Sequence, residues 1–147
     1  MPRPRFFLLI NRAQRAIKTR AERETLDAIG LTTLELVALW ALSAEPRLGI
    51  QALAKALHVD HAVISRLSKQ LVRKGMTRRV SDPDDGRKTL LEITDLGATK
   101  ADEGHRILHL ANERIARGFT DDELAIVARF LEQLIEVGHE SGPLEVS

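Results

Sequence analysis

Residues 61–74, HAVISRLSKQLVRK, place cations and hydrogen-bonding groups along one side of a helix. At about 100° per residue, the inner face is formed by Ile64, Leu67, Ser68 and Leu71. The outer face carries Ala62, Ser65, Arg66, Lys69 and Arg73, with Gln70 beside them. No acidic residue occurs between His61 and Arg79, whereas an ordinary solvated helix face mixes both signs. Such a face suits DNA, because small residues let a helix enter the major groove and cations neutralise phosphates.

The positions of these side chains indicate a different role for each. Ser65 can meet a base edge or a phosphate, and Arg66 can make a bidentate contact with guanine. Lys69 and Arg73 are better placed for phosphates, and His61 is a further candidate phosphate contact. We therefore expect residues 61–74 to be the recognition helix of a DNA-binding protein.

A short charged stretch follows at residues 81–94, SDPDDGRKTLLEIT. Its Pro, Asp and Gly residues are typical of a tight turn, and Leu91 and Ile93 alternate with polar residues as in a strand. We expect a hairpin whose tip, a wing, carries Arg87 and Lys88 toward a narrow minor groove. Asp85 lies two residues before Arg87, and we expect its carboxylate to hold the guanidinium in one rotamer.

The remaining elements must position this helix and this hairpin. The patterns predict helices at about 5–28, 33–45, 50–57, 61–74, 95–117 and 121–137, and a two-stranded hairpin within 76–94. Thr32 or Thr33, Asp60, Thr94 and Thr120 are the expected N-caps, and Gly30, Gly75 and Gly118 the expected stops. The fold class is therefore mainly α with a small β-hairpin wing, a winged helix-turn-helix with flanking helices.

Composition limits the alternatives. The chain has 147 residues, 29% of them charged, which suits one globular domain. It has no cysteine, which excludes disulfides and thiol-based sensing. Residues 66–88 hold eight basic and three acidic residues, while 119–147 hold seven acids and one Arg. The apolar run at 6–10 is too short for a signal peptide or a membrane span, so we expect a cytoplasmic protein with no membrane partner.

Three segments of the chain resemble the MarR (multiple antibiotic resistance regulator) family: 31–43, 50–80 and 81–97. The last is the most specific, because the family's wing reads D-x-R and then L-x-[IL]-T-x-x-G. This chain has Asp85, Arg87, Leu91, Ile93, Thr94 and Gly97 at those positions. One departure is Glu35, where members often carry Gln. The resemblance implies a single domain, 1–147, with dimerisation helices at 1–30 and 98–147 around a DNA-binding lobe at 31–97.

The resemblance also implies a homodimer that binds double-stranded DNA at a pseudo-palindromic operator. Many members are repressors that a small aromatic or anionic effector releases from DNA, and Trp40 with the first and fifth helices could line such a pocket. A dimer interface would also account for the surplus of apolar residues at 6–10 and 124–137. No cofactor is implied.

Three other functions compete with ligand-controlled DNA binding. A winged helix that binds protein should have an apolar or acidic outer face on residues 61–74, which it lacks. We find no residue spacing typical of catalysis, so we expect no enzyme activity and no catalytic residues. His105 and His109 lie four apart on one helix, a spacing that can bind zinc, but further ligands such as Glu22, Glu24 or Glu35 would be needed. We expect no metal site and keep a zinc-responsive repressor as the alternative.

Overall fold

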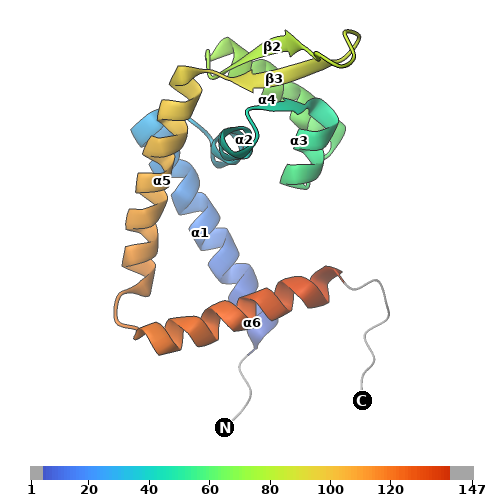
Figure 1. The fold of residues 1–147 in the computed structure, drawn as a ribbon. Helices are drawn as coiled ribbons and strands as arrows, with labels where there is room; N and C mark the ends of the chain where they lie inside the picture. Colours follow the sequence, from blue (N-terminus) through green and yellow to red (C-terminus); the bar gives the residue numbers. More distant parts are fainter. Residues whose placement is uncertain (1–4, 140–147) are drawn as a thin grey trace. The chain divides into compact units, whose positions relative to one another are not determined.

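The computed structural model describes residues 5–139 (Figure 1). Residues 1–4 and 140–147, which belong to the expected dimerisation segments, lie outside the described residues. The elements are α1 (Phe6–Ile29), α2 (Thr33–Ala44), β1 (Arg47–Gly49), α3 (Ile50–Leu57), α4 (His61–Arg73), β2 (Thr77–Ser81), β3 (Thr89–Ile93), α5 (Asp95–Ala116) and α6 (Asp121–His139). The prediction of a mainly helical fold with a hairpin wing is confirmed.

The helix boundaries follow the predicted capping signals closely. α1 ends at Gly30, which takes the left-handed conformation with φ 70°. Thr32, rather than Thr33, caps α2: its side chain accepts a hydrogen bond from the Glu35 backbone N–H, and the Glu35 side chain accepts one from the Thr32 N–H. Asp60 holds the N-cap position of α4, but its side chain makes no capping hydrogen bond, so the expected role of that side chain is wrong.

The sheet has one strand more than we predicted. β1 pairs antiparallel with β3 on the edge opposite β2, with Arg47 opposite Glu92 and Leu48 opposite Leu91. A three-residue strand after Pro46 is too short to show an alternating pattern, and β3 supplies its hydrogen-bonding partner from more than 40 residues away. The third strand gives the hairpin the support that two strands alone would lack.

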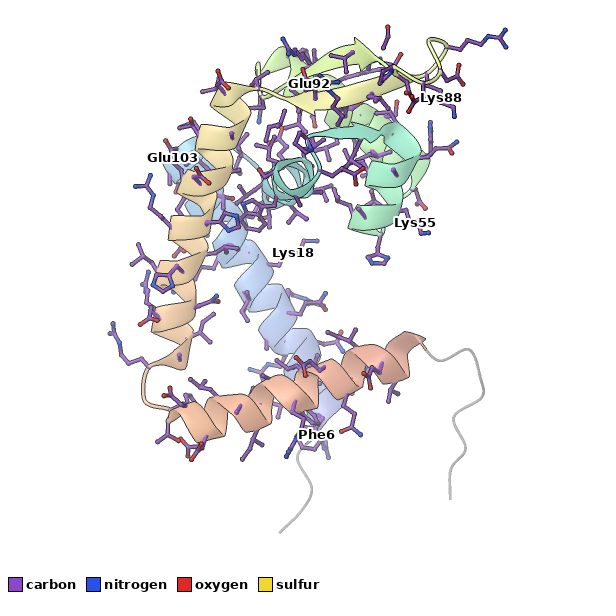
Figure 2. The ribbon with its side chains drawn as sticks, viewed as in Figure 1. Phe6, Lys18, Lys55, Lys88, Glu92 and Glu103 are labelled. Carbon is purple, nitrogen blue, oxygen red and sulfur yellow. The ribbon has the colours of Figure 1, made fainter. Side chains whose placement is uncertain are left out.

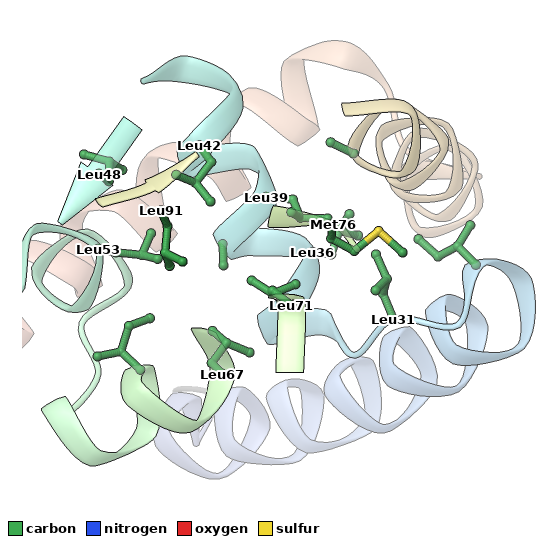
Figure 3. Packing of buried hydrophobic residues seen from close by; sticks show 14 residues of the cluster. Leu31, Leu36, Leu39, Leu42, Leu48, Leu53, Leu67, Leu71, Met76 and Leu91 are labelled. Carbon is green, nitrogen blue, oxygen red and sulfur yellow. The ribbon is translucent and has the colours of Figure 1, made fainter. Parts of the chain in front are cut away.

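The core lies between the sheet and the helices α2, α3 and α4 (Figures 1 and 3). Leu36, Leu39 and Leu42 of α2 are fully buried at its centre. They belong to one cluster with Leu53 of α3, Ile64, Leu67 and Leu71 of α4, and Leu91 of β3. Burying this apolar stripe of α4 fixes which side of the helix faces outward.

Two glycines let α5 approach this lobe closely. A Cβ on Gly97 would lie 2.1 Å from the Met76 carbonyl oxygen, and one on Gly104 would lie 2.3 Å from Leu36 Cδ1. Between them, the Trp40 indole N–H donates to the Ala101 carbonyl oxygen at 3.0 Å. The first turns of α5 are therefore packed directly on α2 and on the end of the recognition helix.

The contacts divide the chain into two compact units, residues 1–109 and 110–147. In the second, Thr120 and Glu123 form the predicted capping box at the start of α6. α6 then exposes several large apolar side chains, namely Ile126, Val127, Leu131, Ile135 and Val137. Within residues 5–139, no single helix is long and apolar enough to cross a membrane; α1 and α2 pass that test only as a pair, and they are bent by 72°.

Candidate nucleic-acid interface

The recognition helix α4 is held at both ends by backbone geometry. It starts after the left-handed residue His58, φ 51°, which closes the turn from α3. At its other end the Met76 N–H donates to the Leu71 carbonyl oxygen and the Gly75 N–H to that of Val72. This pair of bonds is a Schellman motif, and Gly75 adopts the positive φ, 72°, that the motif requires. The short helix, tight turn and second helix therefore form the expected helix-turn-helix.

The structure places the predicted DNA-contacting face of α4 on the outside. Ile64, Leu67, Ser68 and Leu71 are buried, as the periodicity predicts. Ser68 is satisfied there because its hydroxyl donates to the Ser65 carbonyl oxygen at 2.8 Å. Five of the candidate residues are exposed and two are half-buried: His61, Ala62, Arg66, Lys69 and Arg73 are exposed, and Ser65 and Gln70 are half-buried.

A shallow hollow of about 390 Å³ lies between α4 and the wing. It is lined by Arg66, Lys69, Val72, Arg73 and Arg79. None of these four cations forms an ion pair with another residue of the part that the structure describes. The result is a concave surface of unneutralised positive charge with an apolar floor, which can hold a phosphate of a nucleic acid.

Sequence reasoning missed Arg79 as a member of this surface. Arg79 lies opposite the buried Leu91 in the β2–β3 pairing, so both side chains point to the face of the sheet that α4 occupies. Its neighbour Arg78 lies opposite Glu92 and points to the other face. The available signal was the alternation of side chains between the two faces of the sheet along residues 77–81. That alternation does not say which side chains face α4, and only the register with β3 decides it.

The wing tip is a tightly hydrogen-bonded turn. The Asp82 N–H donates to the Lys88 carbonyl oxygen at 2.9 Å, and the Lys88 N–H donates to that of Asp85 at 2.8 Å. The Asp82 carboxylate accepts the Asp84 N–H at 2.9 Å, and the Asp85 carboxylate accepts the Arg87 N–H at 3.2 Å. These acids therefore shape the turn.

The expected pairing of Asp85 with the Arg87 guanidinium is wrong. The Asp85 carboxylate binds the Arg87 backbone, and its second oxygen lies 3.8 Å from the Lys88 ammonium. Within one turn, the backbone N–H two residues on is closer to the carboxylate than the end of a long side chain. Arg87 is consequently exposed with its guanidinium outside any ion pair of the described residues, while Lys88, labelled in Figure 2, is partly neutralised.

Glu92 joins all three strands on the face of the sheet away from α4. Its carboxylate accepts a hydrogen bond from Arg47 of β1 at 2.7 Å and another from Arg78 of β2 (Figure 2 labels Glu92). The hydrogen bond from Arg47, and then that from Arg78, lowers the pKa of Glu92 below its ordinary value. This bridge links the three strands at the base of the wing.

Three of the five candidate metal ligands, His105, Glu22 and Glu35, have other partners in the structure. The His105 ring stacks on Trp40, with 4.6 Å between centroids and 15° between planes. Glu22 accepts the Thr33 N–H at 3.1 Å, and Glu35 accepts the Thr32 N–H and the Lys74 ammonium. Within the described part of the chain, no three His, Asp or Glu side chains form a group that could hold a metal ion.

Comparison with known proteins places this geometry in a family. Residues 31–89 match the model of the MarR family. The transcriptional regulator AdcR of Streptococcus pneumoniae is 32% identical over 97 residues, which are 64% of this chain and 66% of AdcR. The multiple antibiotic resistance protein MarR of Escherichia coli is 25% identical over 119 residues, 80% of this chain and 83% of MarR.

The solved structures show the same fold. The PcaV transcriptional regulator of Streptomyces coelicolor superposes with a TM-score of 0.78 at 24% identity, over 92% of this chain and 98% of PcaV. PcaV has also been solved in complex with its natural ligand, and that structure superposes with a TM-score of 0.73.

Proposed function

The chain belongs to the MarR family of transcriptional regulators, and from this we propose that it is a homodimeric repressor of transcription that a small anionic effector releases from its operator. The main support for DNA binding is the cationic surface formed by α4 and β2. One hollow on this surface is lined by four cations and no acidic residue, namely Arg66, Lys69, Arg73 and Arg79. α4 enters the major groove through its N-terminal small residues, and Arg87 on the wing enters the adjacent minor groove.

The proposed dimer rests on apolar surface that one chain leaves uncovered. Phe7, Leu8 and Leu9 of α1 are 78%, 51% and 52% exposed, and Ile126 and Ile135 of α6 are 56% and 60% exposed. Patches of this kind mark interfaces on proteins that otherwise fold independently. A twofold dimer presents two recognition helices, which explains why the proposed operator is a pseudo-palindrome with half-sites one helical turn apart.

The proposed effector is a small anion, aromatic in part. Arg12, Arg15 and Arg23 lie on one side of α1 and line an open concavity of about 960 Å³. Trp40 and His105, stacked on each other, offer an aromatic surface at the α2–α5 contact. PcaV, which has the same fold, has been solved with its natural ligand, and by analogy we propose that this chain also binds a small molecule. The zinc-responsive alternative has less support, because His105 is stacked and both Glu22 and Glu35 are hydrogen-bonded elsewhere.

The test is a titration against the DNA that flanks the protein's own gene, at several salt concentrations, with random DNA as competitor. We expect nanomolar-range binding at about 10⁻⁸ M or tighter, with a steep salt dependence. Arg87→Ala should bind markedly more weakly. Wild-type protein with no preference for any flanking segment would contradict the proposal.

The dimer is tested separately by sedimentation. Ile135→Glu places a charge in the exposed apolar stripe of α6 and should give a monomer that no longer binds the operator. Glu136→Gln, on the neighbouring polar side of the same helix, is the matched control and should remain dimeric. A monomeric wild type would contradict the proposed assembly.

A further inference from the structure

One side chain joins the ends of three helices in the DNA-binding lobe. Lys74 is the C-cap residue of the recognition helix α4. Its ammonium lies 2.7 Å from Glu35 Oε2 at the start of α2, and 3.0 Å from the carbonyl oxygen of Gly30 at the end of α1. We call these three residues the Gly30–Glu35–Lys74 junction.

The junction is buried on its acidic side. Glu35 is only 2% exposed, and the same carboxylate oxygen that binds Lys74 also accepts the Thr32 N–H at 2.8 Å. A carboxylate removed from water needs a cation and hydrogen bonds to offset its lost hydration. Lys74 is the one cation that supplies this within the described part of the chain, so the pair has a strong preference for a single geometry.

Lys74 is poorly suited to bind DNA itself. Two of its three N–H donors are directed to Glu35 and Gly30, and its charge is neutralised by the buried carboxylate. Arg73 and Lys69 beside it, by contrast, are exposed and line the cationic hollow. The chain thus places two kinds of cation along α4: free ones on the outer face and a paired one at the end.

We propose that Lys74 is a positioning residue, which fixes the angle of the recognition helix by holding its C-terminal end to the α1–α2 junction. The inference rests on the proposed function, because it concerns how α4 is presented to DNA. The chain turns from α1 into α2 through Gly30 and Thr32. The Gly30 carbonyl oxygen accepts from Lys74 directly, and the Thr32 N–H binds the Glu35 oxygen that also binds Lys74. A displacement of α1 therefore changes the position of both acceptors of Lys74. A polar contact between rigid elements transmits such a displacement to α4.

The experiment compares two lysines of the same helix. Lys74→Met removes the ammonium and keeps the length of the side chain, and Lys69→Met does the same on the outer face. Each variant is checked for wild-type circular dichroism, then titrated against operator and random DNA over a salt series. Lys74→Arg, which can donate to both acceptors, is the conservative variant.

The substitutions of Lys74 and Lys69 should change DNA binding in different ways. We expect Lys74→Met to weaken operator binding roughly tenfold, with the salt slope unchanged and binding to random DNA nearly unchanged. Lys69→Met should weaken both DNAs alike and reduce the salt slope by about one. Lys74→Arg should recover most of the operator affinity. A Lys74→Met protein whose salt slope falls like that of Lys69→Met, or whose operator affinity equals the wild type, overturns the inference.

Glu35→Leu keeps the test decisive if Lys74→Met does not fold. It removes both the negative charge and the acceptor of the Lys74 ammonium, and the loss of the negative charge by itself should strengthen binding to any DNA. The positioning role predicts the opposite for the operator, a several-fold loss, and unchanged or stronger binding to random DNA. Operator binding that rises with Glu35→Leu refutes the inference, whereas wild-type protein without operator preference refutes the proposed function itself.

Discussion

Gly97 of α5 lies so close to Met76 that a Cβ at this position would stand 2.1 Å from the Met76 carbonyl oxygen. The Met76 oxygen also accepts the Thr94 N–H at 3.0 Å, and the Thr94 hydroxyl donates to the Gly75 carbonyl oxygen at 2.6 Å. The end of the recognition helix and the start of α5 are therefore in backbone contact. Gly97 is the glycine of the L-x-[IL]-T-x-x-G pattern. Its φ is not positive, so the backbone conformation does not require a glycine here, and the lack of space for a Cβ is the reason for it.

We predict that Gly97→Ala destabilises the fold. The obstructing atom belongs to the backbone and cannot rotate away, so overpacking should lower the free energy of unfolding by about 2 kcal/mol or more. Gly138→Ala is the control, because a Cβ there meets nothing within 4 Å and alanine favours a helix. Thermal unfolding followed by circular dichroism measures both. Equal melting temperatures for the two variants would contradict the close contact at Gly97.

A second prediction concerns the cation that sequence reasoning missed. Arg79→Ala should weaken DNA binding and reduce the magnitude of the salt slope by about one, because Arg79 shares the hollow with Arg66 and Lys69. Arg78→Ala removes the same charge one residue earlier, from the opposite face of the sheet, and should leave the slope unchanged. Fluorescence anisotropy over a salt series checks both, and identical slopes would place Arg79 outside the interface.

The wing tip allows a test of what Asp85 does. Asp85→Asn keeps an oxygen that can accept the Arg87 N–H and removes a negative charge, so operator binding should be equal to or several-fold tighter than the wild type. Asp85→Ala removes the acceptor, loosens the turn and should weaken binding. The same anisotropy titration measures both variants. If Asp85→Asn weakens binding as much as Asp85→Ala, the carboxylate charge rather than the turn is what matters.

The Glu92 bridge predicts an acid-sensitive stability. The pKa of Glu92 is lower in the folded chain than its ordinary value of 4.5, because it accepts hydrogen bonds from Arg47 and Arg78. The folded state therefore favours the ionised form, and the stabilisation is present above pH 4.5 and is lost as the pH falls through the lower folded pKa. Melting temperatures between neutral pH and about pH 3 should fall less steeply for Glu92→Gln than for the wild type.

Glu45→Gln is the control for this titration. Glu45 is exposed at the end of α2 and makes no ion pair with the described residues, so its variant should follow the wild-type curve. If the melting temperature of Glu92→Gln falls with pH as steeply as that of the wild type, the ionised bridge contributes nothing to the stability at neutral pH.

Local chemistry made much of this fold predictable. The stripe of Ile64, Leu67 and Leu71, the stop at Gly75 and the capping box at Thr120 depend on residues within a few positions of one another. Helical periodicity and backbone dihedral preferences act over that range, so the recognition helix, its outer face and the hairpin could be predicted from the chain alone. The family resemblance lies in the same local patterns.

Contacts between distant residues decided the rest. β1 exists because β3 pairs with it, Arg79 belongs to the hollow because Leu91 lies opposite it, and Lys74 binds Glu35, 39 positions away in the chain. No local pattern specifies these partners, since register and burial are set only when the elements pack. The sequence alone determined that the outer face of α4 is cationic. The tertiary structure added Arg79 to that surface, and it decided which cations of the described part are unpaired and which one holds the helices in place.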